Sequence, residues 1–478
     1  MFEQKKLHPI TILYNVFWQL KEILFPIIAI FIFGGTSSKW DFFYHVGLIV
    51  FSMSVLVGGV LSWFFFRYYL HQGELRIENG VFVKKKRFIP FERIQSIDFT
   101  EGILHRPFGL VKVKIETAGG VGEAEAVLTA IQMNDAIQLR DYINRHKNQK
   151  SELEEEKSEN KSHELYKITT KELLILATTS GGIGVVFSAL IAVISQFDEL
   201  IPYKKIFQEF QHVVSSGMIV LTAIIFILFL LLWGVSFLIT MLKYANFTVV
   251  KMENDLIITR GLLEKKQITI PLSRIQAVRI RENILRQPFG LAAVYVESTG
   301  GSVKDNEASS VVVVPVGKKT KIKKLLLEIL SDYELVDNLH APPKKACWRY
   351  ILRNSWIAFP IVGLSLYYFH LWGMISFALF VIFPSWGYLK YRTAGWDITN
   401  KQLTISFRHL EKNTLIMKRN RIQALDYKEG FWQRSAKLAS LNCLVASGIG
   451  GSGGTVYDLR KEEVEKVYNW YSYSMEKC

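Results

Sequence analysis

Basic side chains recur at equivalent positions of this 478-residue chain. The recurring positions are Lys84, Lys265 and Lys412 and, downstream of them, Arg93, Arg274 and Arg421. Lys85, Lys86 and Lys266 lie beside the first two lysines. Each Lys or Arg near an anionic membrane surface contributes about 1 kcal/mol of attraction. All nine residues are therefore candidates for binding lipid or a partner. A solvated strand face for the lysines, and a structural role for the arginines, stay open as alternatives.

The chain carries no pattern of side chains that predicts catalysis. Its ten His residues are dispersed without metal-ligand spacing, and its Cys residues at 347, 443 and 478 form neither a CxxC pair nor a disulfide framework. The Gly-rich stretch 448–454 contains GxGxxG, but strand-like residues follow it, whereas a dinucleotide site needs a helix there. We expect a hairpin at this stretch, and we expect no catalytic residue, metal, cofactor or enzymatic activity.

An internal repeat places the basic residues. The tripeptide Arg-Ile-Gln begins at residues 93, 274 and 421. The shift from the first copy to the second also superposes the Pro-Phe-Gly-Leu of 107–110 on that of 288–291. The third copy is more divergent, with Ser-Ala-Lys at 435–437 in place of Pro-Phe-Gly. A shift that holds over about forty positions indicates three copies of one unit.

Each copy follows a pair of apolar segments. These are 23–35, lengthened by an amphipathic run-up from Val16, with 45–66, then 173–195 with 213–240, and the two halves of 356–388. A helix needs roughly 17–25 residues to cross a bilayer. Six transmembrane helices in three hairpins are therefore expected. Core helices of a soluble protein are disfavoured, because 45–66 and 213–240 contain no Asp, Glu, Lys or Arg.

Small residues within these segments predict helix packing. Ser54, Gly58 and Ser62 recur every four residues and would form a ridge for another helix, and Ser180 and Gly184 could serve the third segment in the same way. No segment has an ionisable residue near its centre, as the path of a transported ion usually does.

Charge predicts the orientation of the chain. Basic residues flank the hairpins on the side of the globular parts, for example at Lys5, Arg67, Lys243 and Arg392. The positive-inside rule then places both termini and all globular domains in the cytoplasm. The net charge of +15 is explained first by this topology, and no nucleic-acid motif accompanies it.

The globular part of each copy is expected to be mainly β with a closing helix. Alternation of apolar and polar residues predicts strands at 75–78, 111–116 and 403–407, and Ile275 and Val278 should face inward around a kink. Two closing helices are predicted from their apolar faces, which are Ile322, Leu325, Leu326 and Ile329, and Val464, Val467, Tyr468 and Tyr471.

The expected domain organisation follows from the repeat. Transmembrane hairpins are assigned to 1–66, 165–240 and 336–388, and globular domains to 67–146, 241–335 and 389–478. Residues 147–164 are charged and poor in apolar side chains, which predicts a solvated linker. The fold class is thus α-helical membrane hairpins plus mainly β (α+β) domains.

These motifs resemble a known family. Two apolar helices, strands that carry Pro-x-x-Arg-Ile-Gln and Arg/Gln-Pro-Phe-Gly-Leu, and a closing helix are similar to the bacterial pleckstrin-homology-like (bPH_2) membrane proteins of the YdbS/YdbT type, in their larger, three-unit kind. The third copy departs from the pattern, with Lys418 in place of the Pro and 431–436 in place of the Ile-Leu-x-x-Pro-Phe segment. The resemblance implies a PH-like fold of two packed antiparallel sheets capped by a helix.

The resemblance also implies a function. It suggests a multi-pass protein of the bacterial cell membrane that associates with a smaller PH-like membrane protein of the YdbS type. It further implies a role in cell-envelope defence against membrane-active peptides such as bacteriocins. The sequence thus favours a non-enzymatic assembly module that binds proteins or lipids. Such a module can assemble as a homo- or hetero-oligomer. The alternative is an exporter or flippase-like protein that removes amphipathic peptides or lipids from the bilayer.

Overall fold

The computed structural model describes residues 4–16, 41–117, 126–148, 163–188, 218–298, 310–447 and 451–472, apart from positions 82, 181, 183, 185, 253, 331 and 337. The chain divides into two compact units. Unit 1 comprises Met1–Lys161 and Leu263–Pro271, and unit 2 comprises Ser162–Leu262 and Leu272–Cys478.

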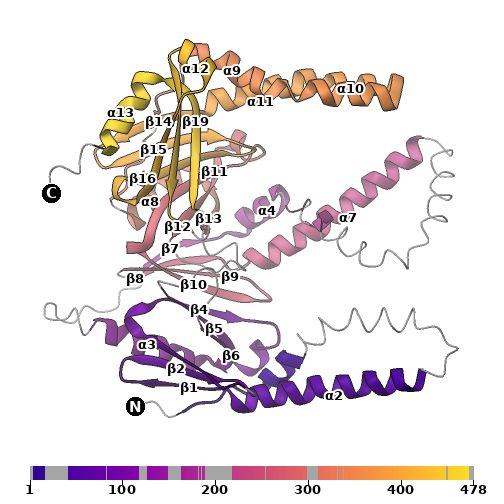
Figure 1. Cartoon of the computed structure of the whole chain (residues 1–478), viewed down its shortest axis with the longest axis vertical. Helices are drawn as coiled ribbons and strands as arrows, with labels where there is room; N and C mark the ends of the chain where they lie inside the picture. The colour runs from indigo at the N-terminus through magenta and orange to yellow at the C-terminus, as the bar shows by residue number, and fades with distance from the viewer. Residues whose placement is uncertain are drawn as a thin grey trace. The chain divides into compact units, whose positions relative to one another are not determined.

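Unit 1 is a helix followed by two antiparallel meanders and a closing helix (Figure 1). Its elements are α2 (Asp41–Phe65), β1 (Arg67–His71), β2 (Glu74–Asn79), β3 (Lys85–Pro90), β4 (Ile94–Glu101), β5 (Leu110–Thr117), β6 (Ala126–Gln132), α3 (Met133–Asn148) and β10 (Lys265–Pro271). The first meander is β1-β2-β3 and the second is β4-β5-β6, to which β10 adds beside β4. Val111, Val113 and Ile115 alternate with polar residues along β5 and are fully buried, because one face of the strand forms the core with α3.

Unit 2 contains the corresponding parts of the second and third copies. Its strands are β7 (His163–Lys167), β8 (Thr248–Met252), β9 (Asp255–Arg260), β11 (Ile275–Glu282), β12 (Leu291–Ser298), β13 (Ser310–Lys318), β14 (Gly395–Thr399), β15 (Gln402–Arg408), β16 (Lys412–Lys418), β17 (Ile422–Lys428), β18 (Leu438–Val445) and β19 (Ser452–Arg460). Its helices include α4 (Thr170–Thr179), α7 (Met218–Tyr244), α8 (Lys319–Ile329), α9 (Lys344–Ser355), α10 (Ala358–Phe369), α11 (Leu379–Thr393), α12 (Phe431–Ser435) and α13 (Lys461–Ser472).

The same succession of elements occurs three times in the described part of the chain. Three successive strands lead through one turn of 3-10 helix into a three-stranded meander and a closing helix. The 3-10 turns are Phe91–Arg93, Leu272–Arg274 and Arg419–Arg421, so each ends at the arginine of Arg-Ile-Gln. The repeated tripeptide therefore marks the corner at which the backbone passes from one sheet to the other.

Single strands pair across successive copies within each unit. β10 of the second copy pairs antiparallel with β4, and β16 of the third copy pairs antiparallel with β11 of the second. The second pairing produces a six-stranded sheet of order β13-β12-β11-β16-β15-β14. We call these two pairings strand junctions. In each, the last strand of one first meander lies beside the first strand of the preceding copy's second meander.

The strands and closing helices predicted from periodicity are confirmed. The strands at 75–78, 111–116 and 403–407 are β2, β5 and β15, and α8 buries all four residues predicted for its inner face. Ile275 and Val278 are buried on either side of a register shift in β11. Tyr468 differs from expectation, since it is 47% exposed, and only Val464 and Val467 of that predicted face are buried.

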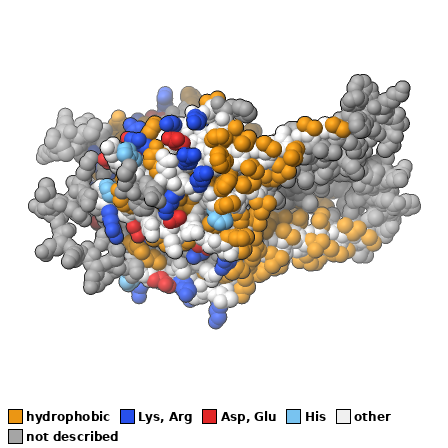
Figure 2. All heavy atoms as spheres, turned by 90° about the horizontal axis from the view of Figure 1, so that it is seen from below, with side chains coloured by type: hydrophobic (Ala, Val, Ile, Leu, Met, Phe, Trp, Pro, Cys, Tyr) orange, Lys and Arg blue, Asp and Glu red, His pale blue; other side chains and the backbone are white. Residues whose placement is uncertain are grey.

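The apolar segments are described in part. Two stretches are long and apolar enough to cross a bilayer, Thr222–Tyr244 and Gly373–Thr393, and the described portion of α2 contributes the shorter apolar helix Leu56–Phe65. The segment expected at 23–35 lies outside the described residues, and the one at 173–195 is described only to Ser188. Six transmembrane helices are thus not confirmed. On the face seen in Figure 2, hydrophobic side chains gather on the side to which α2 projects, whereas charged side chains lie over the strands.

The expected linker 147–164 lies mostly outside the described residues. Its two ends belong to regular elements, because α3 extends to Asn148 and β7 begins at His163. The Gly pairs at 119–120 and 300–301 also lie outside the described residues.

The first strand junction is expected to weaken as pH rises. Burial raises the pKa of Asp98 from 3.8 to about 7, although the Thr269 backbone N–H donates to its Oδ1 at 3.1 Å. A carboxyl with a raised pKa binds its proton more tightly in the folded state, so its contribution is complete below about pH 4 and is lost as pH rises to about 7. The change amounts to at most about 4 kcal/mol. Hydrogen exchange of peptides covering β10 should show this slope, and Asp98→Asn, which keeps the acceptor, should remove it. An unchanged slope in the variant would contradict the assignment.

Candidate functional site

A pocket of about 540 Å³ lies in the third copy, where α9 meets the second meander. Its lining comes from α9, α12, β18, β19 and the end of β17. Helix α9 precedes the apolar helix α10 directly, and α12 begins at Phe431 in the loop between β17 and β18. The pocket therefore lies at the base of the apolar hairpin formed by α10 and α11.

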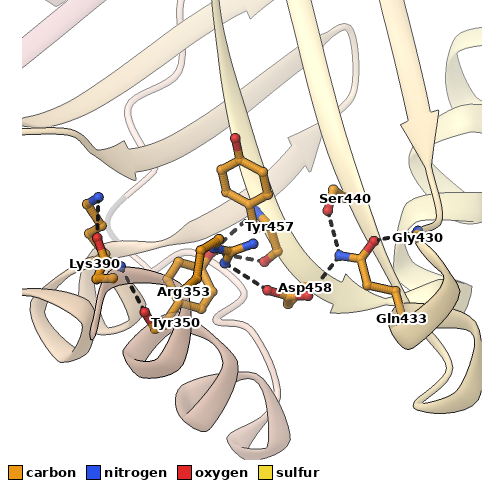
Figure 3. Close-up of polar contacts among 9 residues, drawn as sticks. Tyr350, Arg353, Lys390, Gly430, Gln433, Ser440, Tyr457 and Asp458 are labelled. Atoms are coloured by element: carbon orange, nitrogen blue, oxygen red, sulfur yellow. Dashed lines mark hydrogen bonds and ion pairs between the residues drawn. The ribbon is translucent and has the colours of Figure 1, made fainter. Parts of the chain in front are cut away.

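A buried carboxylate organises the pocket (Figure 3). Asp458 on β19 is 2% exposed and accepts from Arg353 Nη2 on Oδ2 at 2.9 Å. Its Oδ1 accepts from Gln433 Nε2 at 2.8 Å, and the same amide nitrogen donates to Ser440 Oγ at 2.8 Å. Asp458 has a φ of 54°, in the left-handed region that Asp tolerates better than most residues. These contacts hold α9, α12 and β19 together.

Aromatic rings surround the guanidinium of Arg353. Its Cζ lies 4.3 Å from the ring centroid of Tyr457 and 4.9 Å from that of Tyr350, both within the range of cation–π attraction. Burial raises the pKa of Tyr350, so its hydroxyl stays protonated and donates to Tyr457 O at 2.9 Å. Arg353 is therefore fixed in orientation while its side chain remains 41% exposed.

The lining has a net positive charge. Arg349, Arg353 and Lys428 oppose the single carboxylate of Asp458, which leaves two positive charges in excess. Arg349 Nη2 donates to Trp432 O at 2.6 Å. Among the described residues of the lining, Asp458 is the one carboxylate, and no His, Cys or Glu lies beside Ser440. Its chemistry is suited to holding an anionic group by charge-assisted hydrogen bonds.

Exposed aromatic residues flank this pocket. Phe431 and Trp432 on α12 are 80% and 75% exposed, and Trp348 and Trp356 at the α9–α10 segment are also exposed. Aromatic side chains of this kind concentrate at membrane–water interfaces, where an apolar ring and a polar edge are both satisfied. Among the described residues no group of three His, Cys, Asp or Glu side chains is placed to hold a metal ion.

Equivalent loops of the other copies also contact an apolar helix. Gln433 is aligned with Arg286 and His105. Arg286 is buried and its Nε donates to Thr179 Oγ1 on α4 at 2.7 Å, while the His105 ring packs edge-on against Tyr14 at 5.5 Å. The same loops expose large apolar residues, among them Ile103, Phe108, Leu285 and Phe289. In the third copy, this helix–loop contact borders the basic pocket described above.

The lysines singled out in the sequence lie on strands, except Lys84, which directly precedes β3. Lys84, Lys85 and Lys86 are exposed at the start of β3, and Lys86 Nζ is 3.3 Å from Glu78. Lys265 and Lys412 begin β10 and β16, where each faces a glutamate across a strand junction, and Lys266 follows Lys265 opposite Thr100. These residues are not gathered into one site, and their binding of lipid or a partner stays a prediction.

The repeated arginines occupy the corners between the sheets. Arg421 Nη2 donates to Ser273 O at 2.6 Å, which links the third copy to the second. Arg274 O accepts from Gln276 Nε2 at 3.0 Å, and Arg93 is exposed. A common ligand for the three arginines stays a prediction too.

Ser180, which was predicted to pack against another helix, does contact one, but the close glycine contacts involve Gly59 and Gly182 and not the predicted glycines. Ser180 Oγ lies 3.1 Å from Thr240 Oγ1 on α7. A Cβ on Gly59 would lie 2.9 Å from Val16 Cγ2, and one on Gly182 would lie 2.4 Å from Ser236 Oγ, whereas Gly58 and Gly184 face open space. Ser54 and Ser62 are exposed, so packing of another helix on the ridge of α2 stays a prediction.

Sequence reasoning missed the pocket residues Arg349, Arg353, Gln433 and Asp458. One available indication was the Phe431-Trp432 pair, because two large aromatic residues stand where the second copy has Ile-Leu. A basic helix start at Lys344–Arg353 beside an apolar segment was another.

Comparisons with known proteins agree with the repeat. Residues 22–147, 189–330 and 357–475 match the family model described as Bacterial PH domain, and each stretch contains one Arg-Ile-Gln. The UPF0699 transmembrane protein YdbT of Bacillus subtilis (strain 168) is 34% identical over 489 residues, covering 99% of this chain and 99% of that protein. The UPF0699 transmembrane protein YdbS of the same organism is 29% identical over 138 residues, which are 27% of this chain and 84% of that protein.

Proposed function

The chain belongs to the bacterial PH domain family, as its motifs predicted, and from that premise we propose that it is a non-enzymatic, membrane-anchored assembly protein whose PH-like domains bind anionic lipid headgroups and other PH-like domains. The observation that carries this proposal is the basic pocket at the base of the α10–α11 hairpin. Its exposed aromatic residues would lie in the interfacial layer, and its excess positive charge would lie at the depth of the headgroups.

The proposal includes three hairpins with all PH-like domains in the cytoplasm. It is supported by the two described apolar stretches and by the basic residues that flank each hairpin. A cysteine introduced at the exposed Lys324 should then resist a membrane-impermeant maleimide in intact cells and react after permeabilisation. Reaction in intact cells would refute the orientation.

The proposal also includes a partner and a physiological role. The smaller relative YdbS matches this chain over most of its own length, which supports a partner built from the same kind of unit. We propose that the two act together in envelope defence against membrane-active peptides such as bacteriocins. Purification of the tagged chain from native membranes should recover the smaller protein, and its repeated absence would count against the partnership.

Loss of two pocket cations should weaken binding of anionic lipid. In Arg349→Ala/Lys428→Ala we expect about 2 kcal/mol less attraction, or roughly 30-fold weaker binding of phosphatidylglycerol, because each cation contributes about 1 kcal/mol near the headgroups. Native mass spectrometry of the purified chain with added phosphatidylglycerol or phosphatidylcholine would measure this difference.

A matched control separates the pocket from net charge. Lys324→Ala removes an exposed cation from α8, outside the pocket lining, and should bind lipid as the wild type does. Equal binding of phosphatidylglycerol by the double variant and the wild type would refute a headgroup site here. If the wild type also bound phosphatidylcholine more tightly than the double variant does, by the same factor, the attraction would not depend on the charge of the lipid.

A further inference from the structure

Each of the two strand junctions contains a Lys–Glu ion pair at the same position. In the first, Lys265 lies opposite Glu101 with Nζ 3.6 Å from Oε1. In the second, Lys412 lies opposite Glu282 with Nζ 3.3 Å from Oε1. Each junction therefore sets the lysine that begins one strand against the glutamate that ends the other.

The same two positions recur at the outer edges of the described sheets. Lys84 is aligned with Lys265 and directly precedes β3, and Glu429 is aligned with Glu282 and directly follows β17. Among the described strands, β3 is the edge of the sheet β1-β2-β3, and β17 is the edge of the sheet β17-β18-β19. One open edge thus offers the lysine of a junction, and another offers the glutamate.

The exposure of these strands agrees with a missing neighbour. Four of the six residues of β3 are exposed, whereas no residue of the aligned strand β10 is. In β17 only Ile422 is buried, whereas most of the aligned strand β11 is buried against β16 and β12. The strands β3 and β17 are thus more exposed than β10 and β11, the equivalent strands that take part in a junction.

Glu429 makes one of the two lysine contacts that the aligned Glu282 makes. Glu282 binds two lysines, Lys319 at 2.8 Å and Lys412 at 3.3 Å. Lys319 is the first residue of the closing helix α8. Glu429 binds Lys461 at 3.2 Å, the first residue of the closing helix α13. Among the described residues, no lysine from another strand contacts Glu429 in the way that Lys412 contacts Glu282.

We infer that β17 of one copy of this chain pairs antiparallel with β3 of a second copy, and that Glu429 meets Lys84 of that copy. A row of lysines on an edge strand discourages pairing with most other strands. A strand that ends in a glutamate overcomes this barrier, because opposite charges placed directly across a strand pair stabilise it.

The register of the internal junctions fixes the remaining pairs. Carried over to β3 and β17, it places Arg87 opposite Asp426, a second pair of opposite charge. It also places Lys85 opposite Lys428, which weakens the contact, although both side chains are exposed to solvent there.

Such a contact joins two different surfaces, so it is heterologous and generates a ring or an open row of chains. In a membrane-anchored protein the row would extend in the plane of the bilayer. The inference rests on the register of the strand junctions and not on lipid binding. Lys84 and Glu429 do not line the lipid pocket, although Lys428, the last residue of β17, does.

Charge reversal tests this contact in the full-length chain purified in detergent. Lys84→Glu and Glu429→Lys should each weaken self-association by about tenfold, since each places like charges opposite one another. An equimolar mixture of the two variants should regain association, because the introduced glutamate of one chain then meets the introduced lysine of the other. Sedimentation velocity measures the assemblies, and thermal unfolding checks that each variant is folded.

Lys324→Glu, which changes the charge of α8 alone, should associate as the wild type does. A wild-type chain that stays single throughout the micromolar range would overturn the inference, and so would a mixture that fails to regain association. Loss of binding to the smaller YdbS-type relative in Lys84→Glu, with self-association unchanged, would also overturn it and assign the β3 edge to that protein. Unchanged lipid binding in Lys84→Glu, whose changed residue is outside the pocket lining, distinguishes failure here from failure of the proposed function. Glu429→Lys does not serve this comparison, because Glu429 directly follows Lys428 of the lining.

Discussion

Arg279→Met is expected to destabilise unit 2 by about 3–5 kcal/mol, because it leaves the Glu297 carboxylate buried without its cation. Arg279 and Glu297 are 7% and 1% exposed, and Arg279 Nε donates to Glu297 Oε1 at 2.7 Å. Arg279 Nη2 also donates to Gly453 O at 3.3 Å, and Ser447 Oγ donates to Glu297 Oε2 at 3.0 Å. The pair therefore joins β11 and β12 of the second copy to the β18–β19 hairpin of the third copy. Its loss should destabilise the second and the third copy together.

Cys443 gives a direct readout of this effect. It is fully buried on β18, whereas Cys347 is partly accessible, so Cys347→Ser/Cys478→Ser leaves one thiol that reacts on unfolding. The urea or thermal midpoint for reaction with a thiol dye should fall in Arg279→Met. It should recover in Arg279→Met/Glu297→Leu, since replacing a whole buried ion pair by apolar residues is often neutral.

The half-buried pair Lys114–Glu116 provides the comparison. Its atoms are 3.2 Å apart in the first copy, and Glu116 is aligned with Glu297. Lys114→Met should cost less than Arg279→Met, because the side chains of Lys114 and Glu116 are 17% and 14% exposed, against 8% and 2% for Arg279 and Glu297. Equal losses in the two single variants would show that burial does not govern the cost.

Sequence periodicity was sufficient for the strands β2, β5 and β15 and for the closing helices α8 and α13. Strands such as β5 alternate between core and solvent, so their apolar residues repeat every second position. The strand junctions could not be predicted in this way, because pairing of β11 with β16 joins residues more than one hundred positions apart. Lys265 and Lys412 were identified from their repetition, but their nearest charged partners, Glu101 and Glu282, follow only from the register.

The candidate pocket shows the same limit. Arg353 and Asp458 are 105 positions apart, and neither belongs to a motif. Arg279 also escaped notice, because the aligned residues are Asp98 and Asp426, so no repetition marks the position. The Gly-rich stretch was predicted as a hairpin, and its described part fits, since β19 begins at Ser452. The sequence did not predict that the carbonyl oxygen of Gly453 accepts a hydrogen bond from Arg279 of the preceding copy.

Gly387→Ala should destabilise the third hairpin by about 1–3 kcal/mol through overpacking. A Cβ on Gly387 of α11 would lie 2.7 Å from both Ile351 Cα and Tyr350 O of α9. Both are backbone atoms, so no side-chain rotation can make room, and the two helices must separate. Tyr350 and Arg353 would then move away from β19, where Tyr350 OH donates to Tyr457 O. We therefore expect weaker binding of phosphatidylglycerol together with a lower unfolding midpoint, measured with the same thiol dye.

Gly363→Ala on α10 is the matched control, because nothing lies within 4 Å of the Cβ that it adds. Replacing glycine by alanine in a helix stabilises it by about 1 kcal/mol where space allows. The control should thus be neutral or slightly more stable, and the two variants should differ by at least as much as Gly387→Ala differs from the wild type. If both variants behaved alike, helix propensity rather than the close approach of α9 and α11 would decide the outcome. Lipid binding that fell in Gly387→Ala alone would connect the packing of the hairpin to the pocket at its base.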